Sequence, residues 1–261
     1  GRSMNSFFRS LSVDLKRSIF SRSFLTMVAL IFAMQFLNTI YLTTTSMLAK
    51  SCWEDLLEAG LDGDFTEMLF CIAATGYAWS YCVDHKSGFF QQAVQRVGIR
   101  SYCLSRIVSV AVSAFLATVV SMGLFALFSM ALTSGNIVDK SYYRNIGYMD
   151  LVADGKSGLY FVVSCTHMGL ACSAMALTGL VVSAYTPNTY MTVFTPLLIS
   201  MLVQAVNGIV GMQMQWSLHG ILFGYSNFGS VAATFGVCSI LILCGMVLLG
   251  DLFYHRVEKR R

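Results

Sequence analysis

The sequence predicts an all-α, polytopic membrane protein with six transmembrane helices. Apolar residues make up 56% of the chain and charged residues only 11%, whereas soluble domains carry about 25% charged residues. Residues 23–49, 107–138 and 157–250 contain no Lys, Arg, Asp or Glu. Because a hydrocarbon core of about 30 Å needs about 20 apolar residues per helical crossing, these stretches must traverse a bilayer.

The N-terminal segment predicts an amphipathic helix at the membrane surface, over residues 4–22. We expect residues 1–3, which precede Met4, to be a cloning scar. Apolar residues recur at helical spacing on one face, and the other face is basic: Phe7, Phe8, Leu11, Leu15 and Ile19 against Arg9, Lys16, Arg17 and Arg22. Such a helix typically lies in the headgroup region. The alternative is a signal-peptide n-region, but the apolar run that follows exceeds the roughly 7–15 residues of an h-region.

Residues 24–250 are expected to form one membrane domain. Its six crossings are predicted at about residues 24–47, 65–83, 107–133, 157–185, 190–212 and 229–250. Between the last two, residues 213–228 carry polar side chains without formal charge, are too short for a crossing and are too apolar for a free loop. We therefore expect a re-entrant helical segment there, on the outer side, packed against protein so that its backbone groups are satisfied.

Lys and Arg are concentrated on one side of the predicted crossings. That side holds the N-terminal segment, the loop of residues 84–106 and a basic tail at residues 251–261. Its basic residues are Arg2, Arg9, Lys16, Arg17, Arg22, Lys86, Arg96, Arg100, Arg106, Arg256, Lys259, Arg260 and Arg261, and those opposite are Lys50, Lys140, Arg144 and Lys156. The positive-inside rule therefore predicts a multi-pass protein of the plasma membrane with both termini in the cytoplasm.

The loop of residues 84–106 carries the most specific local pattern. After Asp84 and Gly88, four apolar residues fall on one face of a short helix: Phe90, Ala93, Val94 and Val97. The sequence Gly98-Ile99-Arg100-Ser101-Tyr102-Cys103-Leu104-Ser105-Arg106 then leads into the third crossing. A short amphipathic helix at the cytoplasmic surface can dock into a cleft on another protein. The alternative is a solvated interfacial linker.

This loop resembles the coupling segment in permease subunits of ABC type-2 exporters. Those proteins combine an acidic residue and a Gly, a short helix and a Gly-x-Arg-x-Tyr-x-x-x-Arg/Lys entry into the third crossing; here Asp84 stands where Glu is more usual. The layout of the whole chain is most similar to the small permeases of bacitracin-resistance and lantibiotic-immunity transporters. The resemblance implies that the ATPase-coupling residues are Asp84, Gly88, Phe89, Phe90, Val94, Arg96, Val97, Gly98 and Arg100.

The resemblance also implies a transport subunit rather than an enzyme. A cytoplasmic ABC ATPase would hold ATP and Mg²⁺, and this chain would carry no cofactor and no metal. It would pair with an identical or similar permease within membrane lipid, without a nucleic-acid partner. By alternating access it would export an amphipathic or hydrophobic compound, such as a peptide antibiotic, a drug or a lipid-like molecule. The end of a P-loop is imitated by Gly155-Lys156-Ser157, but Asp150 replaces the required first Gly.

Polar residues inside the crossings are candidates for a substrate path between two protomers. Gln35 and Asn38 lie one turn apart on the first crossing, and Gln204 and Asn207 do so on the fifth. Amides in hydrocarbon turn toward protein or a wet cavity, so interhelical hydrogen bonding is the alternative. His167, near mid-depth of the fourth crossing, is either functional or a neutral side chain bonded to a neighbouring helix. A stand-alone ion-coupled carrier or channel is the alternative function.

Overall fold

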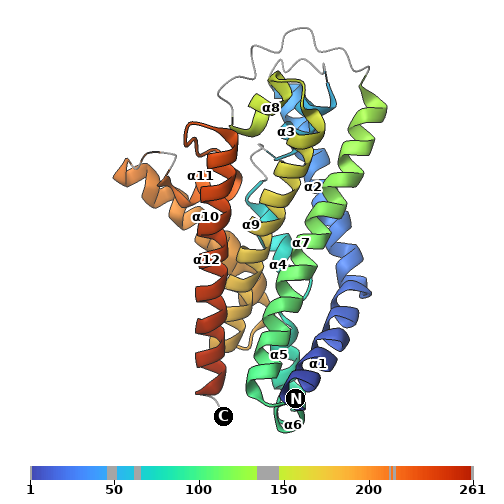
Figure 1. The fold of residues 1–261 in the computed structure, drawn as a ribbon, viewed down its shortest axis with the longest axis vertical. Coiled ribbons are helices and arrows are strands. Elements are labelled where there is room, and N and C mark those ends of the chain that lie inside the picture. Colours follow the sequence, from blue (N-terminus) through green and yellow to red (C-terminus); the bar gives the residue numbers. More distant parts are fainter. Residues whose placement is uncertain are drawn as a thin grey trace.

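The computed structural model describes residues 2–45, 52–61, 66–133, 147–211, 213 and 216–259. Throughout these residues every regular element is a helix, which confirms the predicted all-α class (Figure 1). Five helices are long and apolar enough to cross a membrane. They are α2 (Arg22–Thr45), α7 (Ile99–Leu132), α9 (Ser157–Tyr185), α10 (Thr189–Val210) and α12 (Val231–Glu258).

The predicted second crossing at residues 65–83 is not a single helix. The structure has α4 (Met68–Thr75) and α5 (Ser80–Lys86), separated by a turn at residues 76–79. The indole Nε1–H of Trp79 donates a 2.8 Å hydrogen bond to the Thr75 carbonyl. In a continuous helix this carbonyl would accept from the backbone N–H of Trp79, so the side chain takes the place of one helical hydrogen bond.

The predicted N-terminal helix is present as α1 (Arg2–Ile19), which ends three residues before the predicted boundary. A break at Phe20 and Ser21 separates α1 from α2, and the Ser21 hydroxyl accepts a 3.1 Å hydrogen bond from the Phe24 N–H. Helix α1 then packs along the first turns of α7, as its side-chain contacts below show. A helix is therefore present where one was predicted, and its position at the membrane surface stays a prediction.

Helix α7 has 34 residues and is therefore about 51 Å long, roughly 20 Å more than a hydrocarbon core. Its first turns carry Arg100 and Arg106, whereas charged residues are absent from the rest of the helix. The short helix α6 (Phe89–Val97) lies at this charged end, joined to α7 through Gly98. We call this end, which also holds both chain termini in Figure 1, the base of the bundle.

The opposite end of the bundle carries elements that connect the long helices (Figure 1). They are α3 (Trp53–Leu61), the short 3₁₀ turn η2 (Gly147–Met149) and α8 (Asp150–Ala153). The hydropathy pattern did not predict helix α3, because residues 53–61 are rich in acidic side chains. Its Glu58 accepts a 2.6 Å hydrogen bond from the hydroxyl of Tyr160 on α9, which anchors α3 to the bundle.

The segment predicted to be re-entrant contains one short helix, α11 (Leu218–Phe223). It begins at Ser217, whose hydroxyl accepts a 2.8 Å hydrogen bond from the Gly220 N–H, and ends at Gly224 with φ of 77°. Residues 225–228 then return to α12 without regular structure. A compact helical segment is therefore present, while its re-entry into the bilayer stays a prediction.

Helix α9 is the centre of the bundle and is the most buried of the long helices. Small residues allow this close packing: a Cβ added to Gly169 would lie 2.6 Å from the ring of Phe115 on α7. The Ser173 hydroxyl also donates a 2.8 Å hydrogen bond to the Ala111 carbonyl of α7. By contrast, α10 and α12 expose most of their apolar side chains, so these two helices form the lipid-facing or partner-facing side.

Candidate functional site

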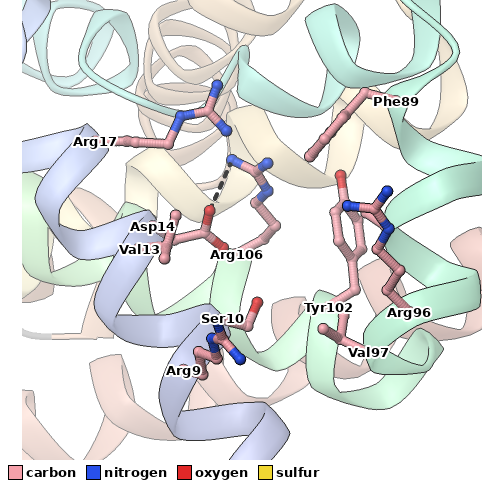
Figure 2. A pocket seen from close by; sticks show the side chains of 11 residues that line it. Arg9, Ser10, Val13, Asp14, Arg17, Phe89, Arg96, Val97, Tyr102 and Arg106 are labelled. Carbon is pink, nitrogen blue, oxygen red and sulfur yellow. Dashed lines mark ion pairs between the residues drawn. The ribbon is translucent and has the colours of Figure 1, made fainter.

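The base of the bundle contains a buried cluster of charged side chains centred on Arg106 of α7. The Arg106 residue is only 2% exposed. Its guanidinium donates hydrogen bonds to Asp84 of α5 and to the hydroxyl of Tyr77, which lies in the turn between α4 and α5. It also pairs with Asp14 of α1 at 3.6 Å (Figure 2). One cation on α7 therefore connects α1 with the segment of residues 77–84.

The two carboxylates of this cluster accept further hydrogen bonds from nearby hydroxyl groups. The Tyr102 hydroxyl donates a 2.8 Å bond to Asp84, and the Ser105 hydroxyl donates a 2.5 Å bond to Asp14. The Tyr77 hydroxyl donates to the second oxygen of Asp14 at 3.3 Å. Removing one partner of a buried ion pair leaves the other charge uncompensated, which costs about 3–5 kcal/mol. This network therefore holds α1, α5 and α7 in one arrangement.

Two aromatic rings enclose the Arg106 guanidinium. Its central carbon lies 5.2 Å from the ring centre of Tyr77 and 5.3 Å from that of Tyr102. These distances are within the range of cation–π attraction, which is strongest for desolvated cations. The two tyrosines therefore stabilise Arg106 through their rings as well as through their hydroxyls.

Sequence reasoning found part of this cluster. It placed Asp84, Tyr102 and Arg106 in the loop motif, but it assigned no role to Arg106 and expected Asp84 to act toward a partner. Asp14 and Tyr77 were missed. One signal was available for Asp14, because it is the only acid in a segment that is otherwise basic, and a lone carboxylate on an otherwise cationic helix needs a partner.

Helix α6 is bounded at both ends by glycines in backbone conformations that other residues rarely adopt. Gly88 has φ of 72°, and Gly98 has φ of 81° with ψ of 151°. A Cβ at either position would meet no atom within 4 Å, so the backbone angle alone requires glycine there. These two glycines let the chain reverse direction on both sides of a helix of nine residues.

The apolar face of α6 packs against its own bundle. Phe90 and Val94 are 8% and 9% exposed. The Phe90 ring lies 5.6 Å from the ring of Tyr81 and 5.5 Å from that of Tyr102, and Tyr81 in turn meets Phe253 of α12 at 5.5 Å. Helix α6 is therefore connected by aromatic contacts to α5, α7 and α12.

The structure brings all nine predicted coupling residues to the base of the bundle, but in different surroundings. Asp84, Phe90 and Val94 are buried, and Val97 is half-buried. Phe89, Arg96 and Arg100 are exposed, together with Gln91, Gln92 and Gln95 of α6. Arg100 donates a 3.3 Å hydrogen bond from Nε to the hydroxyl of Tyr254 on α12. The face of α6 that another protein can reach is thus the polar one.

The first pair of candidate amides is buried within the bundle. The Asn38 amide donates hydrogen bonds to the Gly60 carbonyl at 3.0 Å and to the Thr66 hydroxyl at 3.2 Å, which ties α2 to α3. Gln35 is fully buried beside Gly60 and Phe125. Within the described residues its side-chain amide makes no hydrogen bond.

The second pair lies elsewhere in the molecule. Gln204 is exposed on α10 and Asn207 is half-buried there, and α10 and α2 lie on opposite sides of the bundle (Figure 1). The structure therefore does not bring the two predicted pairs together within one chain.

His167 is bonded on both ring nitrogens. Its Nδ1 lies 2.9 Å from the hydroxyl of Tyr148, and its Nε2 lies 3.1 Å from the Leu222 carbonyl. Because a carbonyl only accepts, Nε2 carries the proton, and in a neutral imidazole Nδ1 then accepts from the Tyr148 hydroxyl. Burial raises the pKa of the Tyr148 hydroxyl, which keeps that donor protonated. The contacts match a neutral side chain that joins α9 to η2 and α11.

In the part of the chain that the structure describes, no group of three or more His, Cys, Asp or Glu side chains is placed to hold a metal ion.

Comparison of the chain with protein-family models, with curated proteins and with solved structures gives no match. The family resemblance therefore depends on the loop motif and on the layout of the chain.

Proposed function

We propose that this chain is the membrane-spanning permease subunit of an ATP-driven ABC type-2 exporter. In this proposal the base of the bundle faces the cytoplasm and α6 docks on a separate ABC ATPase, which binds ATP and Mg²⁺. The permease works as a pair with a second copy or a similar chain. It exports an amphipathic or hydrophobic compound by alternating access between the two halves.

The observation that carries the proposal is the attachment of α6 to the long helices. Helix α6 lies at the end of the bundle (Figure 1), and its buried Phe90 ring contacts Tyr81 of α5 and Tyr102 of α7. Tyr102 is bonded to Asp84, and Asp84 to Arg106. A force applied to the outer face of α6 therefore reaches α5 and α7 without an intervening flexible segment.

This geometry divides side chains of α6 into two groups. The exposed Phe89, Gln92 and Arg96 form the surface offered to the ATPase. The buried Phe90 and Val94 transmit the motion instead of docking. Polar and Arg contacts at a rim, with one partly exposed aromatic anchor, are a common composition for a protein–protein interface.

Six crossings also follow from this proposal. Helix α4, the turn and α5 together comprise the 19 residues 68–86. With the roughly 1.5 Å rise of a helix these residues would span about 28 Å, which matches the thickness of a hydrocarbon core. The Trp79 indole satisfies the carbonyl that the break leaves without its helical donor, as a broken helix in a membrane requires. With α4 and α5 counted as one crossing, both termini lie on the same side, and α11 with its flanking residues forms the re-entrant segment on the other.

The proposed substrate path runs along α10. Gln204 is exposed among apolar neighbours such as Leu202 and Val206, which are 65% and 47% exposed. An amide on such a surface is unfavourable against lipid, so this face is better suited to meet the second protomer. Gln204 and Asn207 then line the seam between the protomers, whereas Gln35 and Asn38 lie buried inside each half.

A site-specific photocrosslinker tests the proposal. Placed at Gln92 on the outer face of α6, it should capture a P-loop ATPase in cell membranes, identified by mass spectrometry and by nucleotide hydrolysis. The same crosslinker at Asp154, which is exposed at the opposite end of the bundle, is the matched control and should capture none. Solute transport by the purified chain without nucleotide, and no ATPase at Gln92, would instead establish a stand-alone carrier or channel.

A further inference from the structure

A cavity of about 660 Å³ lies between α1, α6 and α7 at the base of the bundle. Figure 2 shows its walls: Arg9, Asp14 and Arg17 come from α1, Arg96 from α6, and Arg106 from α7. Four arginines and one carboxylate therefore surround a space large enough for a small molecule or a lipid headgroup.

The cavity has an excess of positive charge that the chain does not neutralise. Asp14 is fully engaged by Arg106, Tyr77 and Ser105. Arg106 is compensated by Asp14 and Asp84. Among the described residues, Arg9, Arg17 and Arg96 form no ion pair with an acidic side chain. Three guanidinium groups from two different helices thus remain available for an anion.

The border of the cavity is apolar and open. Val13 and Phe89 line it and are 51% and 41% exposed. The Arg17 guanidinium carbon lies 6.0 Å from the centre of the Phe89 ring, at the limit of a cation–π contact. A ligand that fits this site is therefore anionic at one end and apolar at the other.

The position of the cavity along α7 points to the membrane interface. Tyr102 and Arg106 line it, and the uncharged part of α7 begins at Ile107. Since about 20 Å of α7 exceeds the hydrocarbon thickness, the cavity lies where the apolar part of the helix meets its charged end. This is the depth at which lipid phosphates occur.

We propose that this cavity binds an anionic phospholipid, with its headgroup in the space lined by Arg9, Arg17 and Arg96 and its acyl chains passing Val13 and Phe89. Guanidinium groups suit this role because their forked donors match phosphate oxygens. Inorganic phosphate shares the charged group but has nothing to occupy the apolar border. The lipid site shares Phe89 and Arg96 with the surface proposed for the ATPase, but it is argued from the contacts of this chain alone.

Native mass spectrometry of the purified full-length chain in a neutral detergent tests the site. Phosphatidylglycerol, phosphatidylcholine and inorganic phosphate are titrated separately. The cavity variant carries Arg9→Gln, Arg17→Gln and Arg96→Gln. The control variant carries Lys16→Gln, Arg22→Gln and Lys86→Gln, which removes the same charge from exposed positions that do not line the cavity. Both proteins are first compared by circular dichroism and size-exclusion chromatography.

We expect the cavity variant to lose on the order of 100-fold in affinity for phosphatidylglycerol, because each basic side chain near an anionic lipid contributes about fivefold. The control variant should change less than about threefold, and phosphatidylcholine should bind weakly to every protein. Should the triple variant fail to fold, Arg96→Gln alone is expected to lose about fivefold.

Three results would overturn the proposal. Equal affinities of the two triple variants for phosphatidylglycerol would show that net charge, and not the cavity, binds lipid. Displacement of the lipid by low concentrations of inorganic phosphate would assign the arginines to a soluble anion. Unchanged lipid affinity together with loss of a co-purifying ATPase would assign them to a protein interface.

Discussion

The hydroxyl of Tyr102 donates a 2.8 Å hydrogen bond to Asp84, joining the helix that follows α6 to the helix that precedes it. This contact closes the base of the loop that contains α6. Both residues also contact Arg106, and through Arg106 the closed loop is connected to Asp14 of α1. Helix α6 therefore cannot move independently of α5 and α7 while the cluster is intact.

Loss of the Tyr102 hydroxyl is expected to destabilise the protein. Tyr102→Phe keeps the ring but removes a buried donor to Asp84, and we expect the free energy of unfolding in detergent to fall by about 1–3 kcal/mol. SDS-induced unfolding in mixed micelles gives the value. Tyr190→Phe, at a position that is 77% exposed on α10, is the control and should change stability by less than about 0.5 kcal/mol. Equal effects of the two substitutions would show that the hydrogen bond contributes nothing.

Removal of the central cation should be more costly than removal of any other charge at the base. Arg106→Met leaves Asp14 and Asp84 buried without their cation, and we expect a loss of about 3–5 kcal/mol in unfolding free energy. Arg106→Lys should restore little of it, since an ammonium cannot form the forked contacts. Arg100→Met, which removes an exposed cation of the same helix, should cost less than about 1 kcal/mol.

A double-mutant cycle separates the Asp14–Arg106 pair from general effects of charge. Asp14→Asn combined with Arg106→Met should be less destabilising than the sum of the two single substitutions, because the double variant carries one unpaired carboxylate fewer. A coupling free energy of about 1–3 kcal/mol is expected from a double-mutant cycle of SDS unfolding measurements. Additive effects would mean that α1 is held to α7 by contacts other than this pair.

The glycines that bound α6 are predicted to tolerate no side chain. Gly98→Ala places a Cβ on a backbone with φ of 81° and ψ of 151°, a region that is essentially restricted to glycine, and should cost about 1–3 kcal/mol. Gly88→Ala, at φ of 72°, should cost about 1–2 kcal/mol. Hydrogen exchange of the α6 amides should accelerate in both variants.

The control for these glycines is Gly236→Ala on α12. Gly236 is helical, and a Cβ there would meet no atom within 4 Å. The substitution should stabilise the helix by up to about 1 kcal/mol, because alanine has the higher helix propensity. If all three substitutions were equally harmless, the positive φ angles at the ends of α6 would not be required in solution.

Hydropathy predicted the five long helices because each contains an uninterrupted apolar run, and that signal is local. The break between α4 and α5 was not predictable in this way. It involves the side chain of Trp79 binding the Thr75 carbonyl, and hydropathy assigns the same value to an indole in a helix and in a turn. The length of the apolar run at residues 65–83 therefore suggested a continuous helix.

The candidate site was predicted only where it is local in sequence. Asp84, Tyr102 and Arg106 fall within one loop motif, but Asp14 joins them from α1 through tertiary contacts that no spacing rule indicates. The amphipathic pattern of α6 likewise predicted an apolar face without indicating what covers it. The structure shows that Tyr81 and Tyr102 cover that face from the same chain, so the polar face is the one that stays exposed.

The two pairs of amides are expected to differ in their effects on stability and transport. Asn38→Leu leaves the Gly60 carbonyl without its donor and should destabilise the protein by about 1–3 kcal/mol. Gln204→Ala with Asn207→Ala should leave unfolding in detergent within about 0.5 kcal/mol of the unsubstituted protein, because Gln204 is exposed and Asn207 only half-buried. Under the proposed function, export in cells, measured as resistance to the transported compound, should nevertheless fall in the double variant.

The control for the α10 amides is Leu202→Ala with Val206→Ala, two exposed apolar residues of the same helix. These two substitutions reduce the apolar surface area of α10 but remove no polar group. If the amides line a substrate path, this control variant should therefore retain export. Equal loss of export in the two double variants would show that the α10 surface only packs against a second protomer. Loss of assembly together with export in the amide variant would give Gln204 and Asn207 a structural role in the pair, as the hydrogen-bonding alternative requires.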